Sequence, residues 1–517
     1  MMKVKINLWW LILISGVLSG LAFPPLPLGF LAFFALVPLI KAFCDDEFHN
    51  GFEKGLVYGL VLNLAIMYWL ALNKGTTWYW ATLSMVAAVI FLAMNYAIIG
   101  LSVGFIGRRL GRNVGIWSFP IIWTAIEYLR SFGSLGFTWN NLCYTQSHAI
   151  QLIQSAAVVG PYGISGWIVV INVLIFRLLE NLEDYRQVSR RMVIIIALFL
   201  IPAIYGMVVL QKPSDENDRR LVNVGLIQPN IDPNAKWDRE SFKNNMQLLH
   251  DLTDSVATQP LDLVVWPETA TPTFLRRNHY AVLTEIREHI ERLEVNLLTG
   301  TPDLERAGED YQYYNATFLL CPHSNRIEDY RKIHLVPFGE YIPLSGYFPE
   351  LSNLNLGQGN FQAGKEVKLF QIPLKVDQRP VSDTILTFNS VICYESTFPD
   401  LVRQATRQGS ELLVIVSNDA WFGNTSAPFL HAEIGRWRAI ENRIPVVRSA
   451  NTGISLILDQ YGRNLQSLPF GKSGWLSAPV TQGNPQTIFV RYGNWPARLC
   501  VILALLLIGY SIIRRKK

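Results

Sequence analysis

The chain has 517 residues, of which 50% are hydrophobic and 16% are charged, and its mean hydropathy is +0.22. Soluble domains carry about a quarter charged residues, so this composition excludes a wholly soluble protein. It also excludes a disordered chain, a collagen-like chain and a small disulfide-stabilised fold. The net charge of +5 is unevenly distributed, because residues 211–493 are acidic while both flanking parts are basic. This pattern gives no reason to propose a nucleic-acid partner.

Apolar stretches near the length that a bilayer requires, about 20 residues, recur along both ends of the chain. We expect about eight membrane-spanning helices, at 8–23, 27–43, 54–72, 80–105, 114–130, 162–179, 192–210 and 495–513. The first stretch resembles a signal peptide, but no small-residue cleavage site follows it, and we interpret it as retained. The sequence therefore predicts a membrane domain at 1–210, a polar linker at 211–219 and a C-terminal helix at 495–513.

The distribution of basic residues predicts the orientation in the membrane. Alternate loops on one side carry nearly all the lysines and arginines, whereas the short loops on the other side carry only Lys74 and Arg130. By the positive-inside rule, both termini are cytoplasmic. With seven helices before it and one after it, the acidic block between them is then exported.

The exported block alternates strand-like runs with amphipathic helical patterns. Short aliphatic runs bounded by turn residues predict strands at 221–227, 261–266, 296–300, 316–320, 384–393, 411–417 and 454–459. Because continuous apolar strands are buried on both faces, we expect a layered α/β sandwich. A helix is predicted from Ser426 to about Arg443.

Three chemically active side chains stand in or beside these runs. Glu268 follows Val264-Val265-Trp266-Pro267, Lys332 lies in Tyr330-Arg331-Lys332-Ile333-His334, and Cys393 ends the run Val391-Ile392-Cys393. Each residue alone has an ordinary structural interpretation, as a helix cap, a solvated lysine or a core thiol. Together they supply a nucleophile, a base and a fixed cation, which are the groups that acyl transfer through a thioester needs. None of the five cysteines has a metal-binding spacing.

These segments resemble a known family. Glu, Lys and Cys in this order, within VVWPETA, YRKIHLVPFGEYIPL and VICYESTFPDL, are similar to the nitrilase superfamily, and the flanking helices resemble its membrane branch, the apolipoprotein N-acyltransferases. The segments NDAWFG (418–423), RAIENR (438–443) and ANTGIS (450–455) also match. The resemblance implies an α-β-β-α sandwich of the carbon-nitrogen hydrolase type at 220–490. Pro229, Thr138 and Cys143 depart from the family pattern, in loops outside the three segments.

The resemblance also implies roles for individual residues. Cys393 would be the nucleophile, Glu268 its general base and Lys332 the cation that stabilises the oxyanion. The backbone N–H of Tyr394 would be a second oxyanion donor, and Glu340 would orient Lys332. The remaining matched positions around the site, supporting the reaction or binding substrate, are Trp237 and Glu395. A nearby lysine is expected to favour the thiolate of the nucleophile.

The implied reaction is a ping-pong acyl transfer without cofactor or metal. An acyl chain passes from a membrane phospholipid to the cysteine and then to the free α-amine of a diacylglyceryl-cysteine at an apolipoprotein N-terminus. We expect a monomer in the bacterial inner membrane with a periplasmic catalytic domain. Two alternatives stay open from the residues: a membrane-tethered amidase that hydrolyses its thioester, and a non-enzymatic lipoprotein-binding membrane protein.

Overall fold

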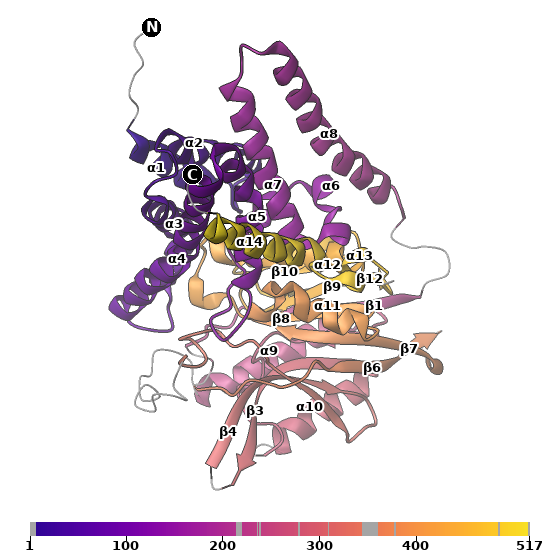
Figure 1. Ribbon diagram of the computed structural model, residues 1–517. Helices are drawn as coiled ribbons and strands as arrows, with labels where there is room; N and C mark the ends of the chain where they lie inside the picture. Colours follow the sequence, from indigo (N-terminus) through magenta and orange to yellow (C-terminus); the bar gives the residue numbers. More distant parts are fainter. Residues whose placement is uncertain are drawn as a thin grey trace. The chain divides into compact units, whose positions relative to one another are not determined.

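The computed structural model describes residues 7–213, 220–234, 236, 239–277, 280–308, 310–343, 360–376, 379–483 and 486–514. Contacts divide the chain into two compact units (Figure 1). One comprises Met1–Leu72, Ala81–Gln211 and Tyr492–Lys517, and the other comprises Asn73–Trp80 and Lys212–Arg491. The short segment Asn73–Trp80 thus packs with the second unit, although the helices on either side of it belong to the first.

The first unit is helical. Its α-helices are α1 (Leu8–Leu21), α2 (Val37–Asp45), α3 (Gly51–Met67), α4 (Trp78–Leu110), α5 (Arg112–Leu129), α6 (Ile150–Ile153), α7 (Ala156–Glu180), α8 (Tyr185–Leu210) and α14 (Trp495–Ile513). Three 3-10 helices connect them: η1 (Gly29–Phe33), η2 (Tyr68–Leu72) and η3 (Leu142–Gln146). Among the described residues, five helical segments are long and apolar enough to cross a membrane: Gly51–Leu72, Trp78–Leu110, Ala156–Glu180, Tyr185–Leu210 and Trp495–Ile513.

The predicted span at 27–43 is not one continuous helix. The chain forms the five-residue η1, leaves it at Phe34, and starts again as the nine-residue α2. Pro38 stands in the first turn of α2, where its missing N–H costs nothing, whereas it would break a helix running through from η1. Helix α1 has 14 residues. The total of eight spans therefore stays a prediction.

Helices α3 and α4 approach each other closely through glycine. Gly51, Gly55 and Gly59 repeat every four residues along one face of α3, and a Cβ at Gly55 would lie 2.1 Å from the carbonyl oxygen of Tyr96 in α4. Small residues at this spacing let helix backbones meet, which is how helices associate in lipid, where burying apolar side chains gains little. The spacing of glycines in the sequence thus determines this helix pair.

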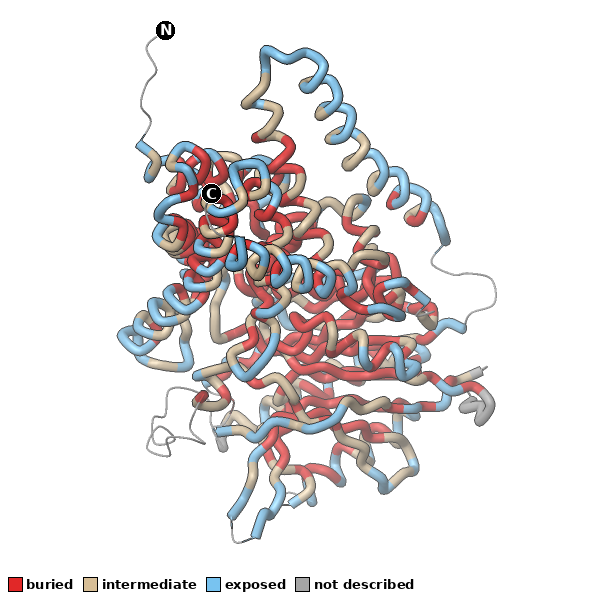
Figure 2. Tube along the Cα trace, in the orientation of Figure 1, coloured by how far each residue is buried: buried red, intermediate tan, exposed pale blue. Residues whose placement is uncertain are grey.

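Helix α8 is mostly exposed, as Figure 2 shows by its pale blue trace. Only 11% of its most apolar stretch is buried in the protein, although that stretch has a mean hydropathy of 2.9. An apolar helix left this bare in water would be unstable, so its surface is suited to lipid.

The second unit contains two six-stranded sheets. In the first, the strand order is β12-β1-β2-β3-β4-β5, and in the second it is β11-β10-β9-β8-β7-β6. The first-sheet strands are β1 (Leu221–Gln228), β2 (Leu263–Val265), β3 (Asn296–Ala307), β4 (Asp310–Leu320), β5 (Ile327–Arg331) and β12 (Gly474–Thr481). The second-sheet strands are β6 (Leu369–Val376), β7 (Arg379–Ile392), β8 (Leu412–Ser417), β9 (Val446–Ala450), β10 (Ser455–Leu458) and β11 (Asn464–Leu468).

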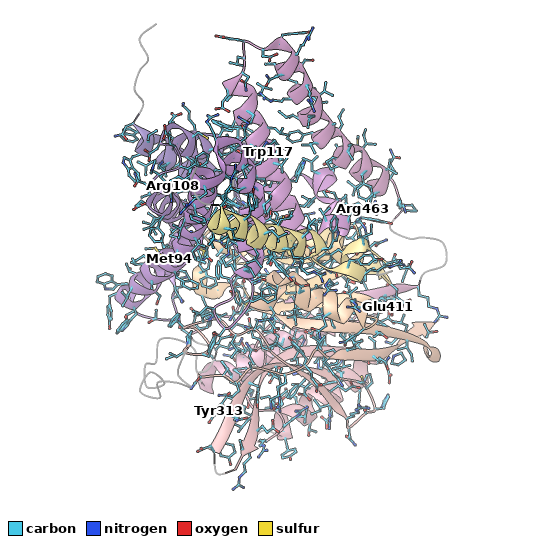
Figure 3. The ribbon with its side chains drawn as sticks, viewed as in Figure 1. Met94, Arg108, Trp117, Tyr313, Glu411 and Arg463 are labelled. Atoms are coloured by element: carbon cyan, nitrogen blue, oxygen red, sulfur yellow. The ribbon has the colours of Figure 1, made fainter. Side chains whose placement is uncertain are left out.

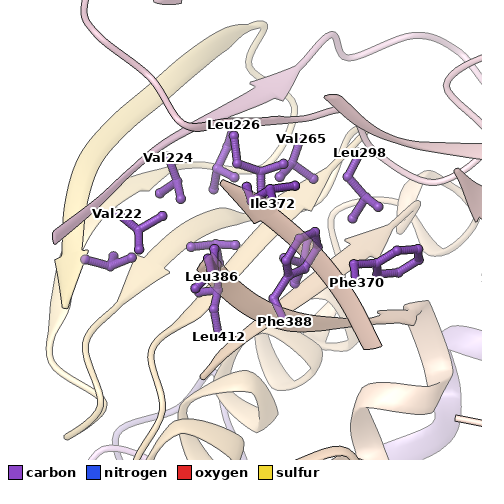
Figure 4. Packing of buried hydrophobic residues seen from close by; sticks show 14 of the residues in the cluster. Val222, Val224, Leu226, Val265, Leu298, Phe370, Ile372, Leu386, Phe388 and Leu412 are labelled. Atoms are coloured by element: carbon purple, nitrogen blue, oxygen red, sulfur yellow. The ribbon is translucent and has the colours of Figure 1, made fainter. Parts of the chain in front are cut away.

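The sheets pack face to face over an apolar core, and helices cover their outer faces. Figure 4 shows Val224, Leu226 and Val265 of the first sheet meeting Leu386 and Phe388 of the second. A second core joins the first sheet to α9 (Arg239–Val256) and α10 (Tyr280–Leu293). Helices α11 (Pro399–Arg407) and α12 (Ser426–Asn442) pack beside the second sheet, and α13 (Ile488–Tyr492) follows the last strand. This confirms the predicted α-β-β-α sandwich.

The central strands of each sheet are parallel and end at the same edge. β1 pairs in parallel with β2 and β2 with β3, while β7 pairs in parallel with β8 and β8 with β9. In open α/β sheets, functional residues gather at the carboxyl ends of parallel strands. Glu268 follows β2 and Cys393 follows β7, so the fold brings both to such ends.

Candidate active site

Glu268 occupies a tightly held turn just after β2. Its side chain is nearly buried, and its Oε1 accepts a hydrogen bond from Asn315 Nδ2 at 2.7 Å. Gly300 of β3 lies directly against this turn, where a Cβ would come within 2.6 Å of the Glu268 Cα. The next residue, Thr269, has a left-handed φ of +47°, which is strained for a β-branched side chain. Glu268 therefore has little freedom to move.

Lys332 lies one residue beyond β5 and is 1% exposed. Its Nζ donates to Glu340 Oε1 at 2.8 Å and lies 3.8 Å from Glu268 Oε1. Its backbone N–H donates to the Asn315 carbonyl at 2.8 Å. The structure thus brings together Glu268, Lys332 and Glu340, whose roles the sequence resemblance implied.

Cys393 is the first residue after β7 and opens the 3-10 helix η5 (Cys393–Thr397). Its φ is +51°, a left-handed conformation unusual for cysteine. The strained turn is held at its carbonyl, which accepts from Ser396 Oγ at 2.9 Å and lies 3.0 Å from His431 Nε2. Tyr394 is buried against the ring of Phe398. A sharp strand-to-helix turn of this kind presents a nucleophile at the strand end.

Charges in the site shift the pKa values of its groups. Burial raises the pKa of the Cys393 thiol, the charge of Glu268 raises it further, and Lys332 only partly opposes them. Lys332 thus favours the thiolate, as expected from the sequence, but burial and Glu268 outweigh it and the pKa of the thiol is raised overall. Burial also raises the pKa of Glu268, against the lowering effect of Lys332. For Lys332, burial disfavours the charge, but Glu340 and Glu268 outweigh it and raise the pKa above its ordinary value.

Glu395 connects the loop that carries Lys332 to the turn that carries Cys393. Its Oε1 accepts from Tyr330 Oη at 2.7 Å, from Ile333 N at 2.6 Å and from His334 N at 3.0 Å. Its Oε2 accepts from Ile392 N at 2.8 Å. The carboxylate is fully buried, and its hydrogen bonds hold the Lys332 loop and the Cys393 turn together. Trp237, the other supporting residue expected from the sequence, lies outside the described residues.

A pocket of about 260 Å³ opens beside Glu268. Its wall includes Trp421 and Phe361 together with Gly75 from the segment Asn73–Trp80. Lys74 N donates to the Trp421 carbonyl at 2.9 Å, which fixes that segment to the pocket wall. Phe361 is placed by a backbone bridge to Tyr313 of β4, labelled in Figure 3. The aromatic wall provides an apolar surface next to a buried carboxylate.

A buried polar network supports the turn at Cys393. His431 Nδ1 lies 2.8 Å from Asp419 Oδ1, and Arg448 donates to Asp419 Oδ2 at 2.5 Å. Cys393, Asp419 and His431 form the one cluster of metal-ligand type among the described residues, with ligand atoms within 4.8 Å of one another. Arg448 already forms an ion pair with Asp419, so the burial of the Asp419 carboxylate is explained by this side chain.

Sequence reasoning missed two residues of the site. Asn315 bonds to Glu268 and also donates to Glu340 Oε1 at 3.0 Å. Lys236 is 2% exposed and donates to the Glu268 carbonyl at 3.1 Å. Asn315 stands just before an apolar strand run, where an amide is costly unless it is bonded. The position of Asn315 could therefore have indicated a site residue. Lys236 lies in a polar loop segment, where a lysine is ordinary and gives no such indication.

Comparison with known proteins identifies the family. Residues 15–174 match the model for the apolipoprotein N-acyltransferase N-terminal domain, and residues 223–486 match that for carbon-nitrogen hydrolase. The apolipoprotein N-acyltransferase of Geobacter metallireducens is 34% identical over 97% of this chain and 95% of its own length. The enzyme of the same name from Chlorobaculum tepidum is 31% identical over 98% and 97%. The chain belongs to the apolipoprotein N-acyltransferase family.

Membership in the apolipoprotein N-acyltransferase family confirms the resemblance seen in the sequence. It makes the chain an acyltransferase of lipoprotein maturation with a carbon-nitrogen hydrolase domain. Among solved structures, a Nesterenkonia amidase of the nitrilase superfamily aligns over 52% of this chain and 93% of its own, with 18% identity and a TM-score of 0.37.

Proposed function

We propose that Cys393, Glu268 and Lys332 carry acyl transfer from a membrane phospholipid to the N-terminal α-amine of a diacylated apolipoprotein. The observation that supports this most is the position of Glu268 Oε1, 3.8 Å from Lys332 Nζ, with both charges acting on the Cys393 thiol. A buried base and a buried cation whose charges act on a half-buried nucleophile match the needs of a thioester mechanism.

The first half-reaction loads the enzyme. Glu268 takes the proton of the Cys393 thiol as the sulfur attacks the sn-1 ester carbonyl. Lys332 stabilises the oxyanion, with the Tyr394 N–H as second donor. The ester C–O bond then breaks, Glu268 returns the proton to the leaving oxygen, and a lysophospholipid departs. The products are a thioester at Cys393 and an unchanged Glu268 carboxylate.

The second half-reaction transfers the chain. The neutral α-amine of the acceptor attacks the thioester carbonyl, and Glu268 takes a proton from the attacking nitrogen. The C–S bond breaks, the proton passes to the sulfur, and an amide forms. Because the resting thiol has a raised pKa, it is a poor leaving group unless protonation accompanies bond breaking. Proton return by Glu268 therefore matters as much as proton removal.

The chain's apolar helices support a place in the bacterial inner membrane. We propose that both termini face the cytoplasm and that the catalytic domain is periplasmic, acting as a monomer. Donor and acceptor are then both anchored in one leaflet, which raises their effective concentration at the site.

The test separates the transferase from a membrane-tethered amidase. Purified protein is incubated with phospholipid vesicles and a synthetic diacylated lipopeptide, and the products are resolved by mass spectrometry. We expect a triacylated lipopeptide with a stoichiometric amount of lysophospholipid. Free fatty acid without a triacylated product would favour hydrolysis, and unchanged activity of Cys393→Ala would overturn the proposed nucleophile.

A further inference from the structure

Lys236 is a buried cation beside the proposed base. It follows β1 in the loop that lines the pocket, and its side chain is 2% exposed. Its Nζ donates to the Glu268 carbonyl at 3.1 Å and to Thr269 Oγ1 at 2.8 Å. Both acceptors belong to the turn that carries the base. An ammonium group is expensive to bury, so its placement here calls for a compensating role.

The two hydrogen bonds of Lys236 hold a turn that is strained. Thr269 adopts a left-handed φ of +47°, a conformation that is strained for a residue other than glycine. Gly300 presses on the same turn from β3, with a Cβ position only 2.5 Å from the Pro267 carbonyl oxygen. Lys236 donates to the same turn from the loop after β1. Together the two contacts fix where the Glu268 carboxylate points.

Lys236 also balances charge in the site. Besides Lys236, the groups that interact with the Glu268 carboxylate are Lys332, Glu340 and Cys393, together with the amide of Asn315. Lys332 is bonded more closely to Glu340, at 2.8 Å, than to Glu268, at 3.8 Å. Lys236 therefore adds a second positive charge that lowers the pKa of Glu268, in the same direction as the larger effect of Lys332.

Resting on the function proposed above, we propose that Lys236 is a positioning residue for the general base, holding Glu268 in its productive orientation and in its ionised form. The two effects act through one side chain. A neutral replacement removes both, whereas arginine keeps the charge and can still donate to the Glu268 carbonyl.

The pKa values set the range in which the charge acts. Burial lowers the pKa of Lys236 to about 7, with Glu268 opposing that change. Below that pH the lysine is cationic and lowers the pKa of Glu268. Above it the charge is lost. The electrostatic contribution of Lys236 is therefore greatest under mildly acidic conditions, where Glu268 begins to take up its own proton.

The experiment measures the rate of acyl-thioester formation at Cys393 from phosphatidylethanolamine vesicles between pH 4.5 and 9, by mass spectrometry. For Lys236→Met we expect the acidic limb to move upward by about one pH unit, together with a loss of rate at every pH because the two hydrogen bonds to the Glu268 turn are gone. Lys236→Arg is expected to keep the wild-type limb. Lys243→Met, at an exposed position of α9, is the matched control and is expected to behave as wild type.

Two outcomes would overturn the role of Lys236. One is a wild-type limb and rate for Lys236→Met, and the other is a loss of the same factor at every pH with the limb unmoved, which a purely structural residue would give. If Lys236→Met does not elute as a folded protein on gel filtration, Lys236→Gln replaces it, since the amide keeps a donor without charge. Cys393→Ala in the same assay tests the proposed function separately: an adduct in that variant would refute the nucleophile, whatever Lys236 does.

Discussion

Asn315 Nδ2 donates to Glu268 Oε1 at 2.7 Å, and this contact connects the middle of β4 to the proposed base at the end of β2. The same amide nitrogen reaches Glu340 Oε1 at 3.0 Å. One neutral donor thus stands between two carboxylates that would otherwise repel each other. The two hydrogen bonds from Asn315 fix the orientation of the Glu268 carboxylate without adding a charge to the site.

Replacing this amide with a carboxylate is expected to disable the base. Asn315→Asp places a third acid beside Glu268 and Glu340, removes the donor and raises the pKa of Glu268 further. We expect thioester formation at pH 7 to fall roughly 10- to 100-fold, the equivalent of losing one buried hydrogen bond to a charged group. Asn464→Asp, on the exposed strand β11, is the control for added charge. Activity within twofold of wild type for Asn315→Asp would contradict this account.

The pH dependence of acylation follows from Glu268. Burial raises its pKa above the ordinary 4.5, and a base acts only when it is ionised. The rate of thioester formation should therefore decline as the pH falls through a midpoint above 4.5. The measurement is a single-turnover rate profile for the wild type, with Glu268→Gln expected to be slow at every pH. A wild-type midpoint at or below 4.5 would show that another group limits the reaction.

Glu395 is expected to stabilise the fold rather than take part in chemistry. In Glu395→Gln, the new amide nitrogen replaces an acceptor and faces one of the N–H groups that the carboxylate now accepts from, either Ile392 N or the pair Ile333 N and His334 N. Leaving a buried donor unpaired costs about 1–3 kcal/mol. Thermal unfolding in detergent should show a lower midpoint than for wild type, while Glu288→Gln on the exposed face of α10 should not.

The same carboxylate has a pH signature in stability. Burial raises its pKa to about 6, above the ordinary 4.5. The folded state thus binds this proton more tightly than the unfolded state. Binding of this proton therefore stabilises the folded state. Its contribution to the free energy of unfolding is complete below pH 4.5 and is lost as the pH rises through about 6. In Glu395→Gln this contribution should vanish, and an identical pH dependence of unfolding in both proteins would be inconsistent with it.

Gly75 is expected to control the width of the pocket. A Cβ there would meet Trp421 Cε3 at 3.0 Å, so Gly75→Val should push the indole into the space beside Glu268. We expect a higher KM for phospholipid with little change in the labelling of Cys393 by a small thiol reagent. Gly509→Val, where nothing lies within 4 Å of the Cβ position, is the control. An unchanged KM would remove Gly75 and Trp421 from the donor path.

The sequence allowed Glu268, Lys332 and Cys393 to be chosen because each stands in or beside a short apolar run, where a charged or nucleophilic group is conspicuous. A layered α/β sandwich followed from the same runs, whereas its α-β-β-α arrangement was implied by the family resemblance. Glu395 was also chosen, but its burial among four hydrogen bonds depends on how two distant loops meet, which no local pattern encodes.

Other features lay beyond local patterns. Strands β11 and β12 are short or partly exposed, so their side chains do not alternate clearly. The first sheet pairs its first strand with its last, β1 with β12, a contact across the whole domain. The role of Lys236 can be inferred only from its hydrogen bonds to the Glu268–Thr269 turn, which is distant in the sequence. In each case the decisive interaction joins residues far apart in the chain, which periodicity and spacing do not report.

The central claim is that an acyl chain passes through the sulfur of Cys393. The most direct measurement incubates the purified protein with phospholipid alone, quenches it in acid, and determines the mass of the proteolytic peptide that contains Cys393. The account predicts a mass increase of one fatty acyl group that is released by neutral hydroxylamine, absent in Cys393→Ala and much reduced in Glu268→Gln. An unmodified peptide in the wild type while lysophospholipid still accumulates would contradict it.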